Sequence, residues 1–261
     1  MTRIVTAALL LALFFPALLW APARLWAALA GLILFLGARE WGRLADFAAL
    51  AAWSYAALMA LLAFALYLAD RPALNLALLA LAAAFWLLLA PLWLHFAWPR
   101  GGNFVRALAG AIVLLPTWVA LVGLRERGPG VLFAIMTAVW IADSAAYYCG
   151  RAFGRRKLAP GISPGKTWEG VAGAALALVA YSAVLSLYAA HAGMIVLAPL
   201  LLALMYFAIL GDLFESWMKR QAGLKDSGHL LPGHGGVLDR VDALTAALPM
   251  AALALLGMKL A

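Results

Sequence analysis

The chain has 261 residues, of which 67% are hydrophobic and only 11% are charged. Because a soluble domain carries about a quarter charged residues, this composition excludes a soluble fold and requires lipid as the solvent for much of the chain. The net charge of +8 would suit a nucleic-acid-binding protein, but the basic residues lie between apolar blocks and form no single basic face. We therefore expect an integral membrane protein that binds no nucleic acid.

The apolar segments predict an all-α fold, a polytopic bundle of about nine transmembrane helices, because a spanning helix needs roughly 20 mostly apolar residues. The expected spans are residues 4–21, 23–38, 47–69, 73–97, 104–123, 130–149, 169–190, 194–214 and 241–259. Only Pro22 separates the first two, so one of them could be re-entrant or tilted. The first segment also resembles a signal peptide, with APA at 21–23, but the apolar segments behind it favour a retained helix.

No soluble domain or long linker interrupts these segments. We therefore expect a single integral membrane domain over residues 1–261, with N-terminal spans in 1–129 and catalytic helices and loops in 130–261. Lysine and arginine are enriched in cytoplasmic loops of membrane proteins. With a cytoplasmic N-terminus and nine spans, 14 of the 19 basic residues lie on the cytoplasmic side, together with the polar loops 150–168 and 215–240.

A short group of charged and aromatic residues lies early in the chain, at the predicted cytoplasmic end of the second span. Glu40 and Trp41 stand there between Arg39 and Arg43. Because charged and tryptophan side chains concentrate at membrane interfaces, we interpret this group as an interfacial anchor.

The polar segment 142–170 reads ADSAAYYCGRAFGRRKLAPGISPGKTWEG. Its GKT at 165–167 is not a P-loop, because Pro160 stands where a P-loop needs glycine and no strand precedes it. Lys166 can instead supply positive charge to a triphosphate. Ser163 and Thr167 can donate hydrogen bonds to phosphate oxygens, and Asp143, late in an apolar helix, should face the bundle interior. The alternative for the basic residues of this loop is a headgroup anchor.

A second polar segment holds five of the eleven acidic residues of the chain, between positions 212 and 242. Asp212, Glu215, Ser216 and Lys219 have the spacing i, i+3, i+4, i+7 and so share one helix face. Asp239 and Asp242 share a face at the start of the last span. Two helices would thus bring carboxylates together at one membrane depth, where charge is costly and by default indicates function.

Glycines around His234, at 233, 235 and 236, allow close approach of the backbone to a ligand. The alternative for the whole segment is a solvated loop with ordinary surface ion pairs. The order of its residues favours the functional interpretation: Ser216-Trp-Met-Lys219-Arg220, Lys225-Asp226-Ser227-Gly228, Pro232-Gly233-His234-Gly235-Gly236 and Asp239-Arg240-Val241-Asp242. This order resembles the defining motif of the phosphatidate cytidylyltransferases, also called CDP-diacylglycerol synthases.

The segment 142–170 resembles the same family, which carries an Asp-Thr-Gly-Ala-Tyr-like run and a Ser-Pro-Gly-Lys-Thr-Trp-Glu-Gly run. Ser144 stands here where threonine is common, and Ala145 where glycine is common. The resemblance covers the C-terminal half, from about Ala142. It implies that CTP and phosphatidate give CDP-diacylglycerol and pyrophosphate, in phospholipid biosynthesis, at the cytoplasmic face of a bacterial inner membrane.

The resemblance and the residue chemistry together give the expected site. Catalytic roles are expected for Asp212, Lys219, Lys225, Asp226, Asp239, Arg240 and Asp242, with Asp212 and Asp239 as metal ligands. Substrate-binding roles are expected for Asp143, Ser163, Lys166, Thr167, Glu169, Ser216, Arg220, His234, Gly235 and Gly236. Mg²⁺ is the expected cofactor, because its preferred ligands are carboxylate, phosphate and water oxygens. The resemblance allows a second cation, membrane lipid as a partner, and a homodimer.

Three other functions remain open from the sequence. A CTP-dependent lipid kinase would share the membrane, the nucleotide and the metal, but would release CDP. A CDP-alcohol phosphotransferase would need a run of aspartates with a different spacing, which is not found. A transporter would bury charge near the midplane and often has repeated halves, whereas the charges here gather at one membrane face.

Overall fold

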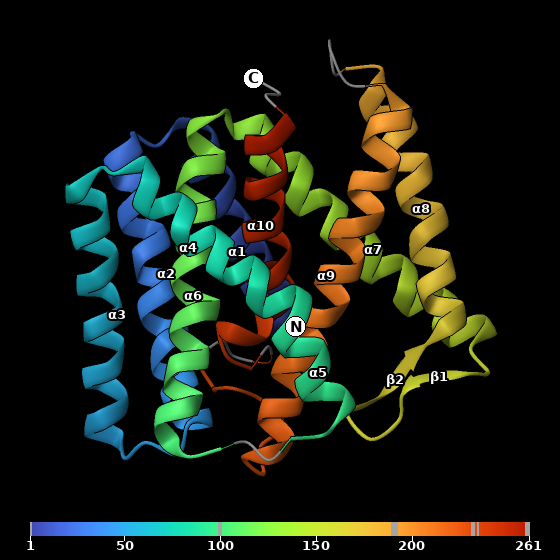
Figure 1. Cartoon of the computed structure of the whole chain (residues 1–261). Helices are drawn as coiled ribbons and strands as arrows, with labels where there is room; N and C mark the ends of the chain where they lie inside the picture. The colour runs from blue at the N-terminus through green and yellow to red at the C-terminus, as the bar shows by residue number, and fades with distance from the viewer. Residues whose placement is uncertain (1, 99–100, 189–192, 231–232, 234, 259–261) are drawn as a thin grey trace.

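The computed structural model describes residues 2–98, 101–188, 193–230, 233 and 235–258, which form an upright bundle of helices (Figure 1). The helices are α1 (Thr2–Trp20), α2 (Ala23–Leu44), α3 (Ala49–Ala69), α4 (Pro72–Ala84), α5 (Ala90–His95), α6 (Asn103–Glu126), α7 (Pro129–Phe153), α8 (Trp168–Ser186), α9 (Met194–Gln221) and α10 (Leu238–Met258). A π-helical turn, Phe85–Leu89, joins α4 to α5. Two short strands, β1 (Lys157–Ala159) and β2 (Ser163–Thr167), lie between α7 and α8.

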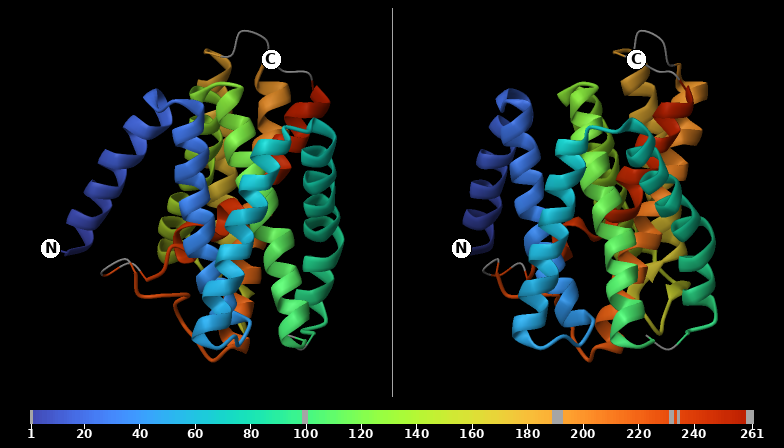
Figure 2. Two further views of the ribbon diagram at one scale, coloured as in Figure 1. Left: turned by 90° about the vertical axis from the view of Figure 1, so that its left-hand side faces the viewer. Right: turned by 60° about the vertical axis from the view of Figure 1, so that its left-hand side comes forward.

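Eight helical segments in the described chain are long and apolar enough to cross a membrane, with α4, the π-helical turn and α5 counting as one, Pro72–His95. They confirm the predicted polytopic helical bundle, and the protein is a multi-pass membrane protein. The first expected span, 4–21, is not among these eight, and the apolar helix in its place is the shorter Leu11–Trp20. Figure 2 shows α1 leaning away from the other helices, which it approaches near its C-terminal end.

The all-α prediction did not include the hairpin between α7 and α8. Its strands are antiparallel, and Lys157 pairs with Thr167 while Ala159 pairs with Ser163. The sequence of β2, SPGKT, contains proline and glycine, which are depleted in strands, so its composition indicated a loop. The hairpin lies at one end of the bundle and carries Lys166 (Figure 1).

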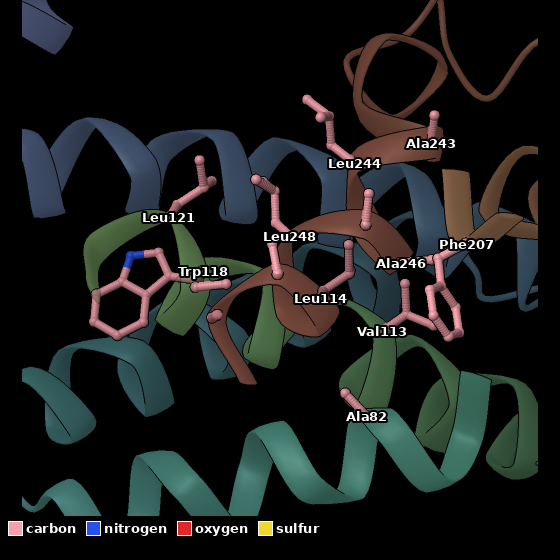
Figure 3. Close-up of a cluster of buried hydrophobic side chains, with 14 of the residues drawn as sticks. Ala82, Val113, Leu114, Trp118, Leu121, Phe207, Ala243, Leu244, Ala246 and Leu248 are labelled. Carbon is pink, nitrogen blue, oxygen red and sulfur yellow. The ribbon is translucent and has the colours of Figure 1, made fainter. Parts of the chain in front are cut away.

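Helix α10 occupies the centre of the bundle and packs against α2, α4, α6, α7 and α9. It begins partway along the bundle, and the segment 222–237 leads into it from one end (Figure 1). Figure 3 shows buried side chains of α6, such as Val113 and Leu114, beside Ala246 and Leu248 of α10. At Gly211 of α9, an added Cβ would lie 2.7 Å from the carbonyl oxygen of Asp242, so glycine permits α9 and α10 to approach closely.

A cluster of aromatic rings fixes the side of α9 that faces the site. Phe214 lies 6.4 Å from the stacked ring of Trp41 and contacts Phe85, Trp86 and Trp93 edge to face, at 5.2, 5.7 and 5.6 Å. The π-helical turn contributes the first two of these edge-on rings. Because Phe214 sits between Asp212 and Glu215 in the sequence, burying its ring among these aromatics also sets the rotation of the carboxylates that flank it.

Candidate active site

Lys219 forms the centre of a buried ionic cluster between α9 and α10. Its Nζ lies 2.7 Å from Asp239 Oδ1 and 3.2 Å from Glu215 Oε1. Glu215 is 2% exposed and Lys219 is 8% exposed. The expectation that the two helices bring their carboxylates together is therefore confirmed. Lys219 was expected to bind phosphate, but its ammonium group already has two carboxylate partners.

Asp239 holds the segment 222–237 in place. Its Oδ2 accepts hydrogen bonds from the backbone N–H of Ser227, at 2.9 Å, and of Gly236, at 2.8 Å. The Ser227 hydroxyl lies 3.0 Å from the same oxygen, and Lys219 donates to the other. Among the described residues only Lys219 donates to Oδ1, so a metal at Asp239 would bind at that oxygen, beside the Lys219 ammonium group or in its place. The assignment of Asp239 as a metal ligand stays a prediction.

Glu40 of α2 belongs to the same network, although sequence reasoning placed it at the membrane interface. It is 2% exposed, and its Oε2 lies 2.8 Å from the Ser227 hydroxyl. The backbone N–H groups of Val237 and Leu238 donate to its two oxygens, at 3.0 and 2.8 Å. The first N–H groups of a helix lack partners within the helix, so the Glu40 carboxylate caps the start of α10.

The interpretation of Glu40 as an interfacial anchor was therefore wrong. An acidic side chain inside an otherwise apolar span was the signal that could have revealed its role. The flanking Arg39 and Arg43 hid that signal, because arginine at a helix end is typical of an anchor.

The glycines of the 222–237 segment make room for these carboxylates. A Cβ at Gly228 or at Gly236 would overlap the Glu40 carboxyl group. Gly235 has a φ of +81°, which favours glycine, and a Cβ there would lie 2.7 Å from Asp239 Oδ2. The glycines were expected to allow close approach to a ligand, and they allow close approach to two carboxylates of the chain itself. His234 lies outside the described residues.

A second, more accessible cluster adjoins the buried one. Lys166 of β2 forms an ion pair with Asp212 of α9, with 2.5 Å between Nζ and Oδ2, and both side chains are about a quarter exposed. The Ser216 hydroxyl donates to Asp212 Oδ1 at 3.2 Å. Asp143 of α7 is close enough to Lys166 and Asp212 for their charges to interact. The charge of Asp242 likewise interacts with those of Asp212 and Asp143. Two expected site residues of segment 142–170, Asp143 and Lys166, therefore lie beside the carboxylates of α9 and α10.

Two other expected site residues of segment 142–170, Thr167 and Glu169, stabilise the hairpin itself. Thr167 is buried, and its hydroxyl oxygen accepts a hydrogen bond from the Gly170 N–H at 3.1 Å, so it caps α8. Glu169 accepts hydrogen bonds from the backbone N–H groups of Arg155 and Arg156, at 3.1 and 3.2 Å. These contacts shape the loop that carries Lys166, and the expected contacts of Thr167 and Glu169 with substrate stay predictions.

The remaining expected residues lie around the two clusters. Lys225 and Asp226 are exposed on the 222–237 segment, and Ser163 is half-buried at the start of β2. Arg220 is exposed at the end of α9, where its Nη1 lies 3.4 Å from the Leu224 carbonyl oxygen. Arg240 is exposed on the first turn of α10, beside an apolar cavity. Their expected roles in catalysis and substrate binding stay predictions.

Comparison with known proteins shows the family of the chain. The model of the Cytidylyltransferase family matches residues 1–257. A phosphatidate cytidylyltransferase of Pseudomonas aeruginosa is 44% identical over 258 residues, which cover 95% of this chain and 94% of the relative. One from Haemophilus influenzae is 39% identical over 197 residues, 67% of each chain. One from Brucella melitensis is 48% identical over 151 residues, 58% of this chain and 54% of the relative. The chain belongs to the Cytidylyltransferase family.

Proposed function

We propose that this chain is a phosphatidate cytidylyltransferase that converts CTP and phosphatidate to CDP-diacylglycerol and pyrophosphate. The observation that carries the proposal is the partly exposed Lys166–Asp212 pair, which stands over a buried network of carboxylates at one end of a membrane bundle. A site with this mixture of positive and negative side chains suits a nucleoside triphosphate. The named activity of the Pseudomonas aeruginosa relative, which matches 95% of the chain, supports the same reaction.

The reaction asks for positioning and charge neutralisation more than for proton transfer. A phosphate monoester has its second pKa near 6, so the attacking oxygen of phosphatidate is already ionised at neutral pH. That oxygen attacks the α-phosphorus of CTP in line with the departing pyrophosphate. Lys166 can exchange Asp212 for a phosphate oxygen, because both side chains are accessible. Lys219 keeps Asp239 and the loop in place, so that the site is rigid before substrate binds.

The acidic residues fit a divalent cation. Five carboxylates, Asp143, Asp212, Glu215, Asp239 and Asp242, gather around only two lysines. Among the described residues no three side chains are arranged to hold a metal alone. Mg²⁺ is usually held by one or two carboxylates together with substrate phosphates. Asp212 would hold it, with Asp143 and Asp242 nearby, and the cation would neutralise charge on the triphosphate.

Three finer parts of the proposal follow from the same reasoning. The hairpin and the 222–237 segment lie at the same end of the bundle (Figure 1), and the excess of basic residues there supports a cytoplasmic active site in a bacterial inner membrane. A second cation, as the family resemblance allows, would find the remaining carboxylates. A homodimer would be tested by cross-linking in native membranes.

The decisive experiment uses the purified chain in detergent with labelled CTP, phosphatidate and Mg²⁺. We expect pyrophosphate and CDP-diacylglycerol in equal amounts, and loss of both when Mg²⁺ is chelated. Asp212→Asn should lower turnover by at least about a hundredfold, as the loss of a group that stabilises transition-state charge does. Asp70→Asn, a matched change in the left-handed residue that ends α3, should not. Release of CDP with a phosphorylated lipid would refute the proposal.

A further inference from the structure

An apolar cavity of about 600 Å³ lies between α1 and the rest of the bundle. Leucines, tryptophans and other apolar side chains of α1, α2, α6, α7 and α10 make up most of its lining. Arg240 is the one charged side chain among the described residues that line it. The cavity is thus apolar along its walls and cationic where it meets the first turn of α10.

Aromatic contacts hold the outer wall of this cavity. The Phe14 ring of α1 packs edge to face against Trp26 of α2 and Trp140 of α7, at 6.1 and 6.3 Å. Leu13 and Leu32, which also line the cavity, are 72% and 52% exposed. The exposure of these two lining leucines, one on α1 and one on α2, indicates that the cavity is open to the surroundings of the bundle on this side.

The inner wall is formed by α6 and α10. Figure 3 shows Leu121, Leu244 and Leu248 pointing to the same side of these helices, and all three line the cavity. From Arg240 to Leu248 the α10 axis rises about 12 Å, and from Gly37 to Trp26 the α2 axis spans about 16 Å. Half of a hydrocarbon core of about 30 Å is about 15 Å. The cavity is therefore about as long as the acyl layer of one leaflet.

The position of the ionic site agrees with a lipid in this cavity. Asp212 lies two residues before position 214, where the apolar span is expected to end, so it lies close to the edge of the hydrocarbon. A lipid phosphate beside Asp212 would have its acyl chains extending toward the opposite face, which is the direction in which the cavity runs from Arg240.

We propose that this cavity binds an acyl chain of phosphatidate while Arg240 binds the phosphate of the same molecule. The inference rests on the proposed function and adds the place of the lipid. Arg240 adjoins Asp239 in the sequence and is exposed, so its guanidinium can form paired hydrogen bonds to a phosphate monoester.

The test compares two matched substitutions on α1. Ala17→Trp places a large ring in the cavity, because Ala17 lines it, whereas Ala12→Trp adds the same ring at an exposed position outside the lining. We expect Ala17→Trp to lower kcat/KM for dioleoyl phosphatidate at least about tenfold more than for dibutanoyl phosphatidate, because several methylenes lose their burial. Ala12→Trp should leave this ratio unchanged, and neither variant should alter the KM for CTP.

The outcomes separate this inference from the proposed function. If the unmodified chain releases no pyrophosphate with either lipid, the proposed function fails. If it is active, but Ala17→Trp affects both lipids equally or neither lipid, the acyl site is refuted.

A second measurement does not depend on turnover or on how the variants fold. Dioleoyl-type phosphatidate carrying a photoreactive group near the end of one acyl chain is cross-linked to the unmodified protein in detergent. Labelled peptides should come from α1, α2 and α10, which line the cavity. Labelling of lipid-facing surfaces elsewhere should persist when short-chain phosphatidate is added. Labelling confined to the outer faces of α3 and α8 would contradict the inference.

Discussion

Replacement of Glu40 by alanine should reduce turnover, although Glu40 is far in sequence from every residue of the expected site. The substitution removes the acceptor of two backbone N–H groups, those of Val237 and Leu238, in a region where Glu40 itself is 2% exposed. Ser227 loses one partner but keeps Asp239. Each buried donor left without a partner costs about 1–3 kcal/mol, so the two together cost about 2–6 kcal/mol.

If the full cost raises the activation free energy of the reaction, the lower value of about 2 kcal/mol reduces kcat about 30-fold, since 1.36 kcal/mol corresponds to a factor of ten in rate. Glu40→Gln keeps one acceptor but turns an NH₂ group toward the other N–H, so we expect an intermediate loss. Pyrophosphate release in detergent, with kcat and KM measured separately, gives the comparison. Glu126→Ala, at the end of α6, serves as the matched control and should keep its activity.

The reasoning would be refuted by a well-folded Glu40→Ala protein with normal kcat. It would also be refuted if the melting temperature fell while the activity of the folded fraction stayed unchanged, since the carboxylate would then stabilise the fold without shaping the site.

Three further predictions follow from the site. Asp239→Asn should abolish turnover while the protein still inserts into membranes, since breaking a buried ion pair costs about 3–5 kcal/mol; normal turnover in a radiochemical assay would contradict this. Lys166→Met should lower kcat/KM for CTP about a hundredfold, whereas Lys157→Met on the paired strand should change it less than threefold in the same assay. Gly236→Ala should destabilise the protein by about 1–3 kcal/mol through overlap with Glu40, as measured by thermal unfolding, and an unchanged melting temperature would argue against the packing.

Hydropathy located the helices well because lipid imposes one length and one composition on a span. It located their ends poorly. The expected second span stopped at residue 38 and the eighth at 214, whereas α2 continues to Leu44 and α9 to Gln221. Hydropathy marks the edge of the hydrocarbon, and these helices continue past it as they carry polar residues into the site.

Helical spacing predicted which residues of the site share a helix face, because residues three or four positions apart lie on the same side of a helix. Glu215 and Asp239 lie close together, as the spacing on the two helices indicated, with Lys219 between them. The spacing did not reveal which lysine is free to meet a substrate. That distinction depends on burial, since Lys219 is enclosed by two carboxylates while Lys166 is accessible.

The contact between Glu40 and Ser227 could not be predicted from the sequence. No local pattern links the two residues, because their hydrogen bond depends on how α2 packs against α10 and the segment before it. The hairpin was missed for a related reason: its strands are short, and pairing between Ala159 and Ser163, not strand propensity, defines them.

The contacts of Glu40 also have a consequence for how the protein is made. Its three hydrogen-bond donors follow it by 187 to 198 residues, so ribosomes complete α2 long before the partners of its carboxylate exist. Glu40 stands four residues before the end of α2, and its carboxylate has none of these partners until segment 222–237 and the first turn of α10 have been made. The ionic network at the start of α10 is therefore completed late in biosynthesis, after the helices that α10 packs against have been made.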